Sequence, residues 1–349
     1  MMANRDILAI GTSAGGVEAL QFLATKLPRD LPASVLVTLH LPSSFDSSLD
    51  TILSRAGPLP ARFATDGELM ERGRIYIAPP ARHLLVDGKQ HGRRHGNQLS
   101  LGVGPRENNA RPAIDPMLRS VAVCCGPRSI GVVLTGTLGD GAAGLWALKQ
   151  CGGLAVVQDP EDAAYSEMPQ TALRRSNVDR VARLADMPTV LQRLVQEPAG
   201  EPTPVPEHFK VELEIARSGL SAMSTMDHIG RRSVLTCPDC GGVMWKIDEG
   251  ELLHYRCHLG HAYTLDPMSI ALDETMRRAL ASGLRALEER VALARDISAR
   301  ASRREQKKTA ASWAEKASAF EREAETVRAS IRRIDAIASS GREGRKTAP

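Results

Sequence analysis

Three polar side chains, Ser13, His40 and Asp140, are the residue types that activate a hydroxyl nucleophile for acyl transfer. In such a triad the serine attacks a carbonyl, the histidine takes its proton, and the carboxylate orients the histidine. Their order along the chain differs from that of the α/β-hydrolases, and Ser13 lacks the G-x-S-x-G turn of those enzymes. A triad therefore requires a fold that brings the three residues to one place.

Each of the three residues follows a predicted buried strand. Short β-branched runs predict strands at residues 7–11, 34–40 and 129–136, and the carboxyl ends of parallel strands meet at one edge of a sheet. We therefore expect Ser13, His40 and Asp140 to share that edge.

Other roles are open for each residue taken alone. The segment GTSAGG could cradle a phosphate at a helix N-terminus, His40 could cap or pack, and Asp140 could cap a helix over 141–151. Nucleotide binding would also need a carboxylate near the end of the second strand, where His40 stands, so we rank that function last.

Strands alternate with helical patterns through the first 195 residues, which predicts an α/β fold with a doubly wound, mostly parallel sheet. Another strand is predicted over 153–159. The predicted helices cover residues 17–27, 46–55, 114–124, 141–151 and a last segment from 187. Residues 1–196 are thus expected to form the catalytic domain.

Cysteines and histidines gather in a second candidate site within CPDCGG (237–242) and YRCHLGH (255–261). A C-x2-C pair followed by glycine is typical of a metal knuckle, so we predict zinc on Cys237, Cys240 and Cys257. His261 is the first candidate for the fourth ligand, with His258 and His254 as alternatives. A redox-active CxxC pair is the other interpretation. The remaining cysteines, at 124, 125 and 151, are expected to be small buried apolar residues.

The rest of the chain divides at a proline-rich segment, 197–207, which predicts an extended linker. A small metal-binding module is expected at 208–265. It begins with a predicted strand over 208–216, for which a short helix is the alternative. Two apolar stripes with helical spacing predict a helical hairpin or coiled coil at 266–338, joined by a polar turn, and these helices are candidates for self-association. Residues 339–349 are predicted to be disordered.

Charge and hydropathy exclude some classes of protein. The net charge of +4 is spread evenly, with 21 basic and 19 acidic residues up to position 200 and 24 and 22 beyond it. A nucleic-acid partner is therefore not expected. No apolar run is long enough for a transmembrane helix or a signal peptide, so we expect no membrane insertion and a cytoplasmic location.

Several motifs in fixed order resemble the catalytic domain of the chemotaxis protein-glutamate methylesterases, over roughly residues 5–195. They are IGTSAGG, LHLP, ARPAIDPMLRSVA, VVLTGTLGDGAAG and VVQDPEDAAYSEMP. The resemblance implies a serine esterase that removes γ-methyl esters from glutamates of methyl-accepting chemotaxis receptors, and that can deamidate receptor glutamines. It implies Ser13 as nucleophile, His40 as base and Asp140 as the orienting carboxylate, with no cofactor for catalysis.

The chain departs from the family pattern at the loops beside the triad. Ala14 stands where the family commonly has Thr, and Thr137-Leu138-Gly139 replaces Met-Gly-Asn. Backbone N–H groups of the glycine-rich turn and near Thr137 are candidates for an oxyanion hole. Ser13 lies directly after the first strand, so we expect no N-terminal phospho-receiver domain. The esterase activity would then be constitutive or controlled in another way. A signalling or scaffold protein that keeps this fold for binding, without the catalysis, is the alternative function.

Overall fold

A seven-stranded sheet forms the centre of the N-terminal part of the chain, in a computed structural model that describes residues 4–41, 47–90, 93–219, 222–249 and 252–346. All neighbouring strands are parallel, as predicted. In spatial order the strands are β3 (Ala61–Phe63), β4 (Ile75–Ile77), β2 (Ser34–Leu39), β1 (Ile7–Thr12), β7 (Ser129–Val133), β8 (Leu154–Gln158) and β9 (Arg180–Ala182). The sequence patterns did not identify the two edge strands, β3 and β9, which have only three residues each.

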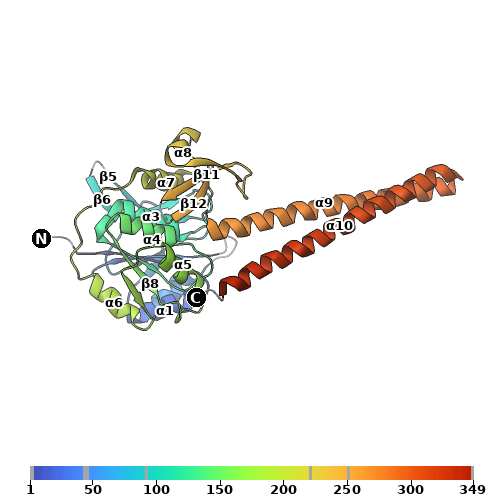
Figure 1. Ribbon diagram of the computed structural model, residues 1–349. Helices are drawn as coiled ribbons and strands as arrows, with labels where there is room; N and C mark the ends of the chain where they lie inside the picture. The colour runs from blue at the N-terminus through green and yellow to red at the C-terminus, as the bar shows by residue number, and fades with distance from the viewer. Residues whose placement is uncertain (1–3, 42–46, 91–92, 220–221, 250–251, 347–349) are drawn as a thin grey trace. The chain divides into compact units, whose positions relative to one another are not determined.

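Helices cover both faces of this sheet (Figure 1). One apolar core lies under α3 (Ile114–Cys125) and α4 (Ala142–Gln150), with α5 (Glu167–Arg175) beside them. The opposite core lies under α1 (Gly16–Lys26), α2 (Leu49–Ala56) and α6 (Met187–Leu194). Central strands buried on both faces explain the runs of Val, Ile and Leu in the sequence. The doubly wound α/β prediction is confirmed.

Two further elements extend the α3 side. The strands β5 (His83–Gln90) and β6 (Arg93–Gly102) form an antiparallel pair, and a short 3-10 helix, Gly126–Arg128, follows α3. Next to them lies α7 (Glu207–Ser218), whose Phe209 packs edge-on against Trp146 of α4.

The strand predicted over 208–216 is wrong, because this segment lies within α7. Apolar residues at every second position suggested a strand. Four of the five buried residues of α7, Phe209, Glu212, Leu213 and Ala216, instead follow the three- and four-residue spacing of one helical face; Ile215 is the fifth. Gly219, with a φ of 79°, ends the helix in a left-handed conformation that glycine adopts without strain.

The cysteine segment forms a small antiparallel sheet preceded by α8 (Met223–Ile229). Its strands, in order, are β10 (Arg231–Thr236), β11 (Val243–Glu249), β12 (Leu252–Cys257) and β13 (Ala262–Thr264). We call residues 223–264 the cysteine module. Trp245 and Ile247 of β11, Met226 of α8 and Ile215 of α7 make its apolar core.

The chain forms two compact units, Met1–Met268 and Ser269–Pro349. The cysteine module belongs to the first unit, and a boundary at the predicted linker, 197–207, stays a prediction. Across the described residues, no helix combines the length and apolar composition needed to cross a bilayer.

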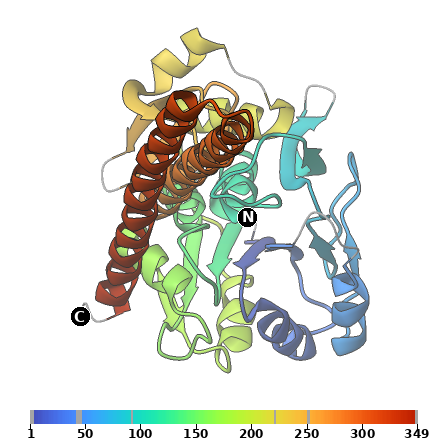
Figure 2. The same ribbon diagram turned by 90° about the vertical axis from the view of Figure 1, so that its right-hand side faces the viewer.

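The second unit is a hairpin of two long helices (Figure 2). Helix α9 (Leu265–Arg303) begins just before this unit, and α10 (Lys307–Lys346) follows a three-residue turn. Ion pairs join the two helices, including Arg295 with Glu321 and Arg328 with Glu288. Helix α10 continues to Lys346, into the segment 339–349 that the sequence predicts to be disordered, and residues 347–349 lie outside the described residues.

Candidate active site

Ser13 and His40 meet at the carboxyl edge of the sheet because their strands are paired in register. Thr12, the last residue of β1, lies opposite Leu39, the last residue of β2. The next residue of each strand therefore reaches the edge at the same level. Nδ1 of His40 lies 3.1 Å from Oγ of Ser13, so a neutral His40 can accept the serine proton there.

Asp140 lies beyond the end of β7, the third central strand, and contacts the other ring nitrogen of His40. It stands in the loop between β7 and α4, and its Oδ2 lies 2.7 Å from Nε2 of His40. Only 1% of the Asp140 side chain is exposed, against 23% for His40. The three predicted residues are thus brought together, with Ser13 and His40 partly exposed and the Asp140 carboxylate buried.

The Asp140 carboxylate is held by backbone and side-chain donors besides His40. Backbone N–H groups of Ile114, Asp115 and Gly141 and the amide of Asn108 all donate to it, over 2.6–3.1 Å. Burial acts to raise the pKa of Asp140, but the bond and charge of His40, followed by the bonds from Ile114 and Asn108, outweigh it and lower the pKa to about 2. The carboxylate is therefore charged at neutral pH and fixed for the imidazole.

A second buried carboxyl group, Asp115, lies behind Asp140. Its Oδ1 accepts the N–H groups of Gly141 and Gly144, so it caps the start of α4, and its Oδ2 accepts the amide of Asn108. Burial and the neighbouring Asp140 charge raise the pKa of Asp115 well above its ordinary value. Asp115 thus supports the loop that carries Asp140 and does not contact His40 itself.

The turn around Ser13 is fixed by the segment after β7. The Ser13 N–H donates to the carbonyl of Thr135, and the Thr135 hydroxyl donates to the carbonyl of Ala14. Gly136 packs so closely that a Cβ there would lie 2.9 Å from Cβ of Ser13. Sδ of Met168 would lie 2.2 Å from the same Cβ, so glycine at 136 allows close packing against both Ser13 and Met168.

The backbone N–H groups near the serine differ in their availability. Those of Ser13, Gly136 and Leu138 are occupied by Thr135, Tyr165 and Glu167. Those of Ala14 and Thr137 have no hydrogen-bond partner among the described residues. The N–H groups of Ala14 and Thr137 therefore stay available as candidate oxyanion donors, whereas those of Ser13, Gly136 and Leu138 do not.

The cysteine module gathers the predicted metal ligands at one point. Ligand atoms of Cys237, Cys240, Cys257 and His261 all lie within 4.8 Å of one another. The Sγ atoms of Cys240 and Cys257 are 3.7 Å apart, and Nδ1 of His261 is 3.5 Å from Sγ of Cys257. Three thiolates and one imidazole at these separations form a donor set that suits tetrahedral zinc.

The two alternative histidines lie outside this cluster. His254 is buried against Glu212, with Nε2 2.8 Å from Oε1. The ring of His258 packs over Gly242, where a Cβ would lie 2.8 Å from the ring Cε1 atom. Of the other cysteines, Cys125 and Cys151 are buried as expected, and Cys124 is half-buried.

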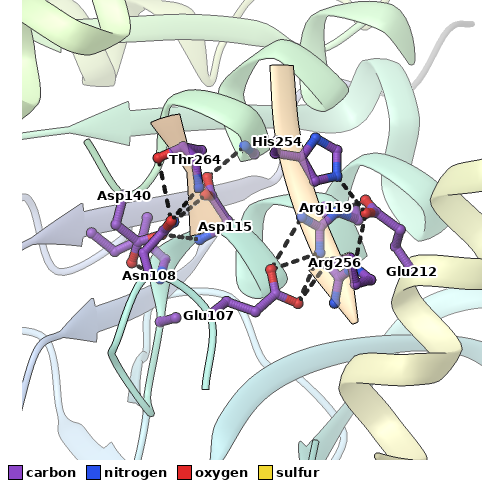
Figure 3. Close-up of polar contacts among 12 residues, drawn as sticks. Glu107, Asn108, Asp115, Arg119, Asp140, Glu212, His254, Arg256 and Thr264 are labelled. Atoms are coloured by element: carbon purple, nitrogen blue, oxygen red, sulfur yellow. Dashed lines mark hydrogen bonds and ion pairs between the residues drawn. The ribbon is translucent and has the colours of Figure 1, made fainter. Parts of the chain in front are cut away.

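Sequence reasoning missed a buried group of charged residues that joins the cysteine module to the α/β part (Figure 3). Arg119 of α3 and Arg256 of β12 each contact both Glu107 and Glu212. All four side chains are at most 3% exposed. Glu107 and Arg256 are 149 residues apart, so a local sequence pattern could not predict their contact. The one local signal was a charged residue on the apolar face of a helix, Arg119 in α3 and Glu212 in α7.

A hydroxyl, an imidazole and a buried carboxylate in line at the edge of a parallel sheet can perform the chemistry of a serine hydrolase. Residues 8–191 match the sequence profile of the CheB methylesterase family. The chain belongs to the CheB methylesterase family.

Known proteins support this membership. The chain is 36% identical over 193 residues to a protein-glutamate methylesterase/protein-glutamine glutaminase of Methanosarcina mazei, covering 55% of this chain and 52% of that protein. It is 37% identical over 197 residues to one from Pectobacterium atrosepticum, covering 56% and 54%. The chain thus spans about half the length of the curated relatives it matches.

The crystal structure of the Thermotoga maritima CheB methylesterase catalytic domain aligns with a TM-score of 0.52 at 32% identity. The alignment covers 56% of this chain and all of that domain. The α/β part therefore has the fold of a methylesterase catalytic domain.

Proposed function

We propose that the chain is a serine esterase that hydrolyses γ-methyl esters of glutamate on chemotaxis receptors or similar signalling proteins. The observation that carries the proposal is the continuous path from Oγ of Ser13 through both nitrogens of His40 to Asp140. The names of the relatives supply the ester and the amide as substrates.

The reaction follows from the geometry in two halves. Oγ of Ser13 attacks the ester carbonyl while Nδ1 of His40 takes its proton, and His40 then returns that proton to the departing methoxide. Methanol leaves, and a glutamyl ester on Ser13 remains. Water attacks this ester, His40 takes the water proton and gives it to Oγ of Ser13, and free glutamate is released. With glutamine as substrate the first leaving group is ammonia.

Asp140 serves the base in both halves. Its carboxylate accepts from Nε2 of His40, which keeps Nδ1 free for the serine and stabilises the imidazolium. The N–H groups of Ala14 and Thr137 are the proposed donors to the oxyanion, each contributing on the order of 3 kcal/mol in the transition state.

The cysteine module is proposed to hold one zinc ion on Cys237, Cys240, Cys257 and His261. Four protein ligands leave no open position, so this zinc is structural.

Labelling with a fluorophosphonate tests the nucleophile without a known substrate. We expect rapid covalent labelling of the wild type at Ser13 and loss of labelling in Ser13→Ala. Ser54→Ala, which changes an exposed serine bonded to Ala61, is the matched control and should label like the wild type. Failure of the wild type to label would favour a scaffold function on the same fold.

A further inference from the structure

The cysteine module contacts the catalytic part through the segment 106–108, which runs along the edge of β13. The Asn108 N–H donates to the Ala262 carbonyl over 2.8 Å, and the Ala262 N–H donates to the Arg106 carbonyl over 3.4 Å. Glu107 and Ala262 pair as a parallel bridge. The loop that leads to α3, and so to the backbone donors of Asp140, is therefore held as an extra edge of the small sheet.

The Asn108 side chain links that edge directly to the triad (Figure 3). Its Oδ1 accepts from the backbone N–H of Thr264 at 3.0 Å and from the Thr264 hydroxyl at 3.3 Å. Its Nδ2 donates to Asp140 at 3.1 Å and to Asp115 at 2.9 Å. The side chain is buried, so both ends of one amide are used between the module and the buried carboxylates.

The same strands of the module carry the metal ligands. Cys257 ends β12 and His261 directly precedes β13. The Cys257 N–H donates to the His261 carbonyl and closes the turn between β12 and β13. Further along the same two strands, His254 pairs with Thr264. An ion held by Cys257 and His261 would therefore close the β12–β13 turn and fix the position of Thr264.

The buried charged group adds a second attachment beside Asn108. Arg256 of β12 donates to Glu107 at 2.9 Å and to Glu212 at 3.0 Å. Burial alone would raise the pKa of Glu107, but Arg119 and Arg256 lower it, so the pair is held as ions. Glu107, the residue next to Asn108, is thus fixed to the module by a contact that cannot break without leaving a buried charge unpaired.

We infer that the cysteine module is part of the support of the catalytic triad: Thr264 positions Asn108, Asn108 positions Asp140, and metal occupancy thereby sets the reactivity of Ser13. This inference rests on the proposed role of Ser13. Asn108 and Thr264 are positioning residues, since neither contacts His40 or Ser13.

The first test compares two neighbouring asparagines. Asn108 and Asn109 both have positive φ, 50° and 65°, so glycine fits the backbone at either position, but Asn109 is exposed. We expect Asn108→Gly to slow fluorophosphonate labelling of Ser13 about tenfold, the loss expected for a hydrogen bond to a charged group, and Asn109→Gly to change it less than twofold. Equal rates in the two variants would overturn the inference.

A spectroscopic readout separates this inference from the esterase proposal. The ring N–H of His40 that donates to Asp140 should give a low-field proton resonance, absent in His40→Ala. We expect this resonance to shift in Asn108→Gly and to stay in place in Asn109→Gly, whether or not any ester is hydrolysed. If the wild type were not labelled at Ser13, only the esterase proposal would be contradicted. If the His40 resonance did not shift in Asn108→Gly, the positioning role of Asn108 would be contradicted.

The link to the module is tested with Thr264→Val, which removes the hydroxyl and keeps the shape. Thr236→Val, at an exposed position of β10, is the control. We expect Thr264→Val to move the His40 resonance in the same direction as Asn108→Gly and by less, because the backbone N–H still donates to Asn108. A resonance moved equally by Thr236→Val would overturn the link.

The metal is tested by a double-mutant cycle with Cys240→Ser, which removes the ligand that lies in the turn between β10 and β11. Zinc content, circular dichroism and Ser13 labelling are measured for the wild type, each single variant and the double variant. We expect Cys240→Ser to lower the zinc content and to slow Ser13 labelling when it is introduced into the wild type. Introduced into Asn108→Gly, it should slow labelling little further. Additive losses, or full labelling without zinc, would overturn the dependence on metal.

Discussion

His40 and Asp140 are joined by a 2.7 Å hydrogen bond although 100 residues separate them in the chain. The bond forms because β2 and β7 flank β1 on either side, so the loops after all three strands meet at one edge. Asp140 is further fixed by backbone N–H groups at the start of α3, so its position depends on that helix as well as on its own strand.

Asp140→Asn should nearly abolish turnover, because an amide can present its NH2 to Nε2 and force the His40 proton onto Nδ1. Nδ1 could then no longer accept from Ser13. By comparison with triad enzymes we expect kcat to fall by about 10³–10⁴ with KM changed little. Steady-state kinetics check this, with circular dichroism to show that the variant is folded. A kcat within tenfold of the wild type would contradict the assigned role.

The low pKa of Asp140 makes a defined contribution to stability in acid. Its folded pKa of about 2 lies below the unfolded value, so the stabilisation is complete above about pH 4 and is lost as the pH falls through about 2. The wild type should lose about 2 kcal/mol more unfolding free energy over this window than Asp140→Asn. Urea unfolding at a series of pH values measures it. Parallel curves for the two proteins would show that Asp140 has no such linkage.

Metal analysis should find one zinc ion per chain, lost in Cys237→Ser. Cys124→Ser is the matched control, since Cys124 lies outside the cluster and burial raises the pKa of its thiol to about 11. Chelation should also lower the thermal midpoint of the wild type, because metal binding is coupled to folding of so small a sheet. Equal zinc content in both variants would exclude Cys237 as a ligand.

Arg256→Met should destabilise the first unit by about 3–5 kcal/mol, because it leaves Glu107 and Glu212 with one buried cation fewer. Arg295→Met is the contrast, since it breaks an exposed ion pair with Glu321 and should cost less than about 1 kcal/mol. Denaturant unfolding of both variants gives the comparison. Similar small losses would mean that the buried charges do not anchor β12.

The sequence predicted the parts of this molecule that depend on local pattern. The strands that end just before Ser13 and His40 follow from β-branched runs, and the edge that they share follows from parallel pairing. The C-x2-C knuckle likewise has a short-range signature.

Long-range contacts could not be predicted in this way. Asn108 gains its role from Thr264, 156 positions away, and an asparagine in a loop carries no signal of such a partner. The segment 208–216 fits both the two-residue period of a strand and the three- and four-residue spacing of a helix. It forms a helix because that conformation buries one face against α3 and α4.

The most direct test of the account is methanol release from a methylated chemotaxis receptor by the full chain. We predict stoichiometric release by the wild type and a loss of at least about 10³-fold in Ser13→Ala, with Ser54→Ala unchanged. Receptor demethylation by Ser13→Ala at the wild-type rate would contradict the account.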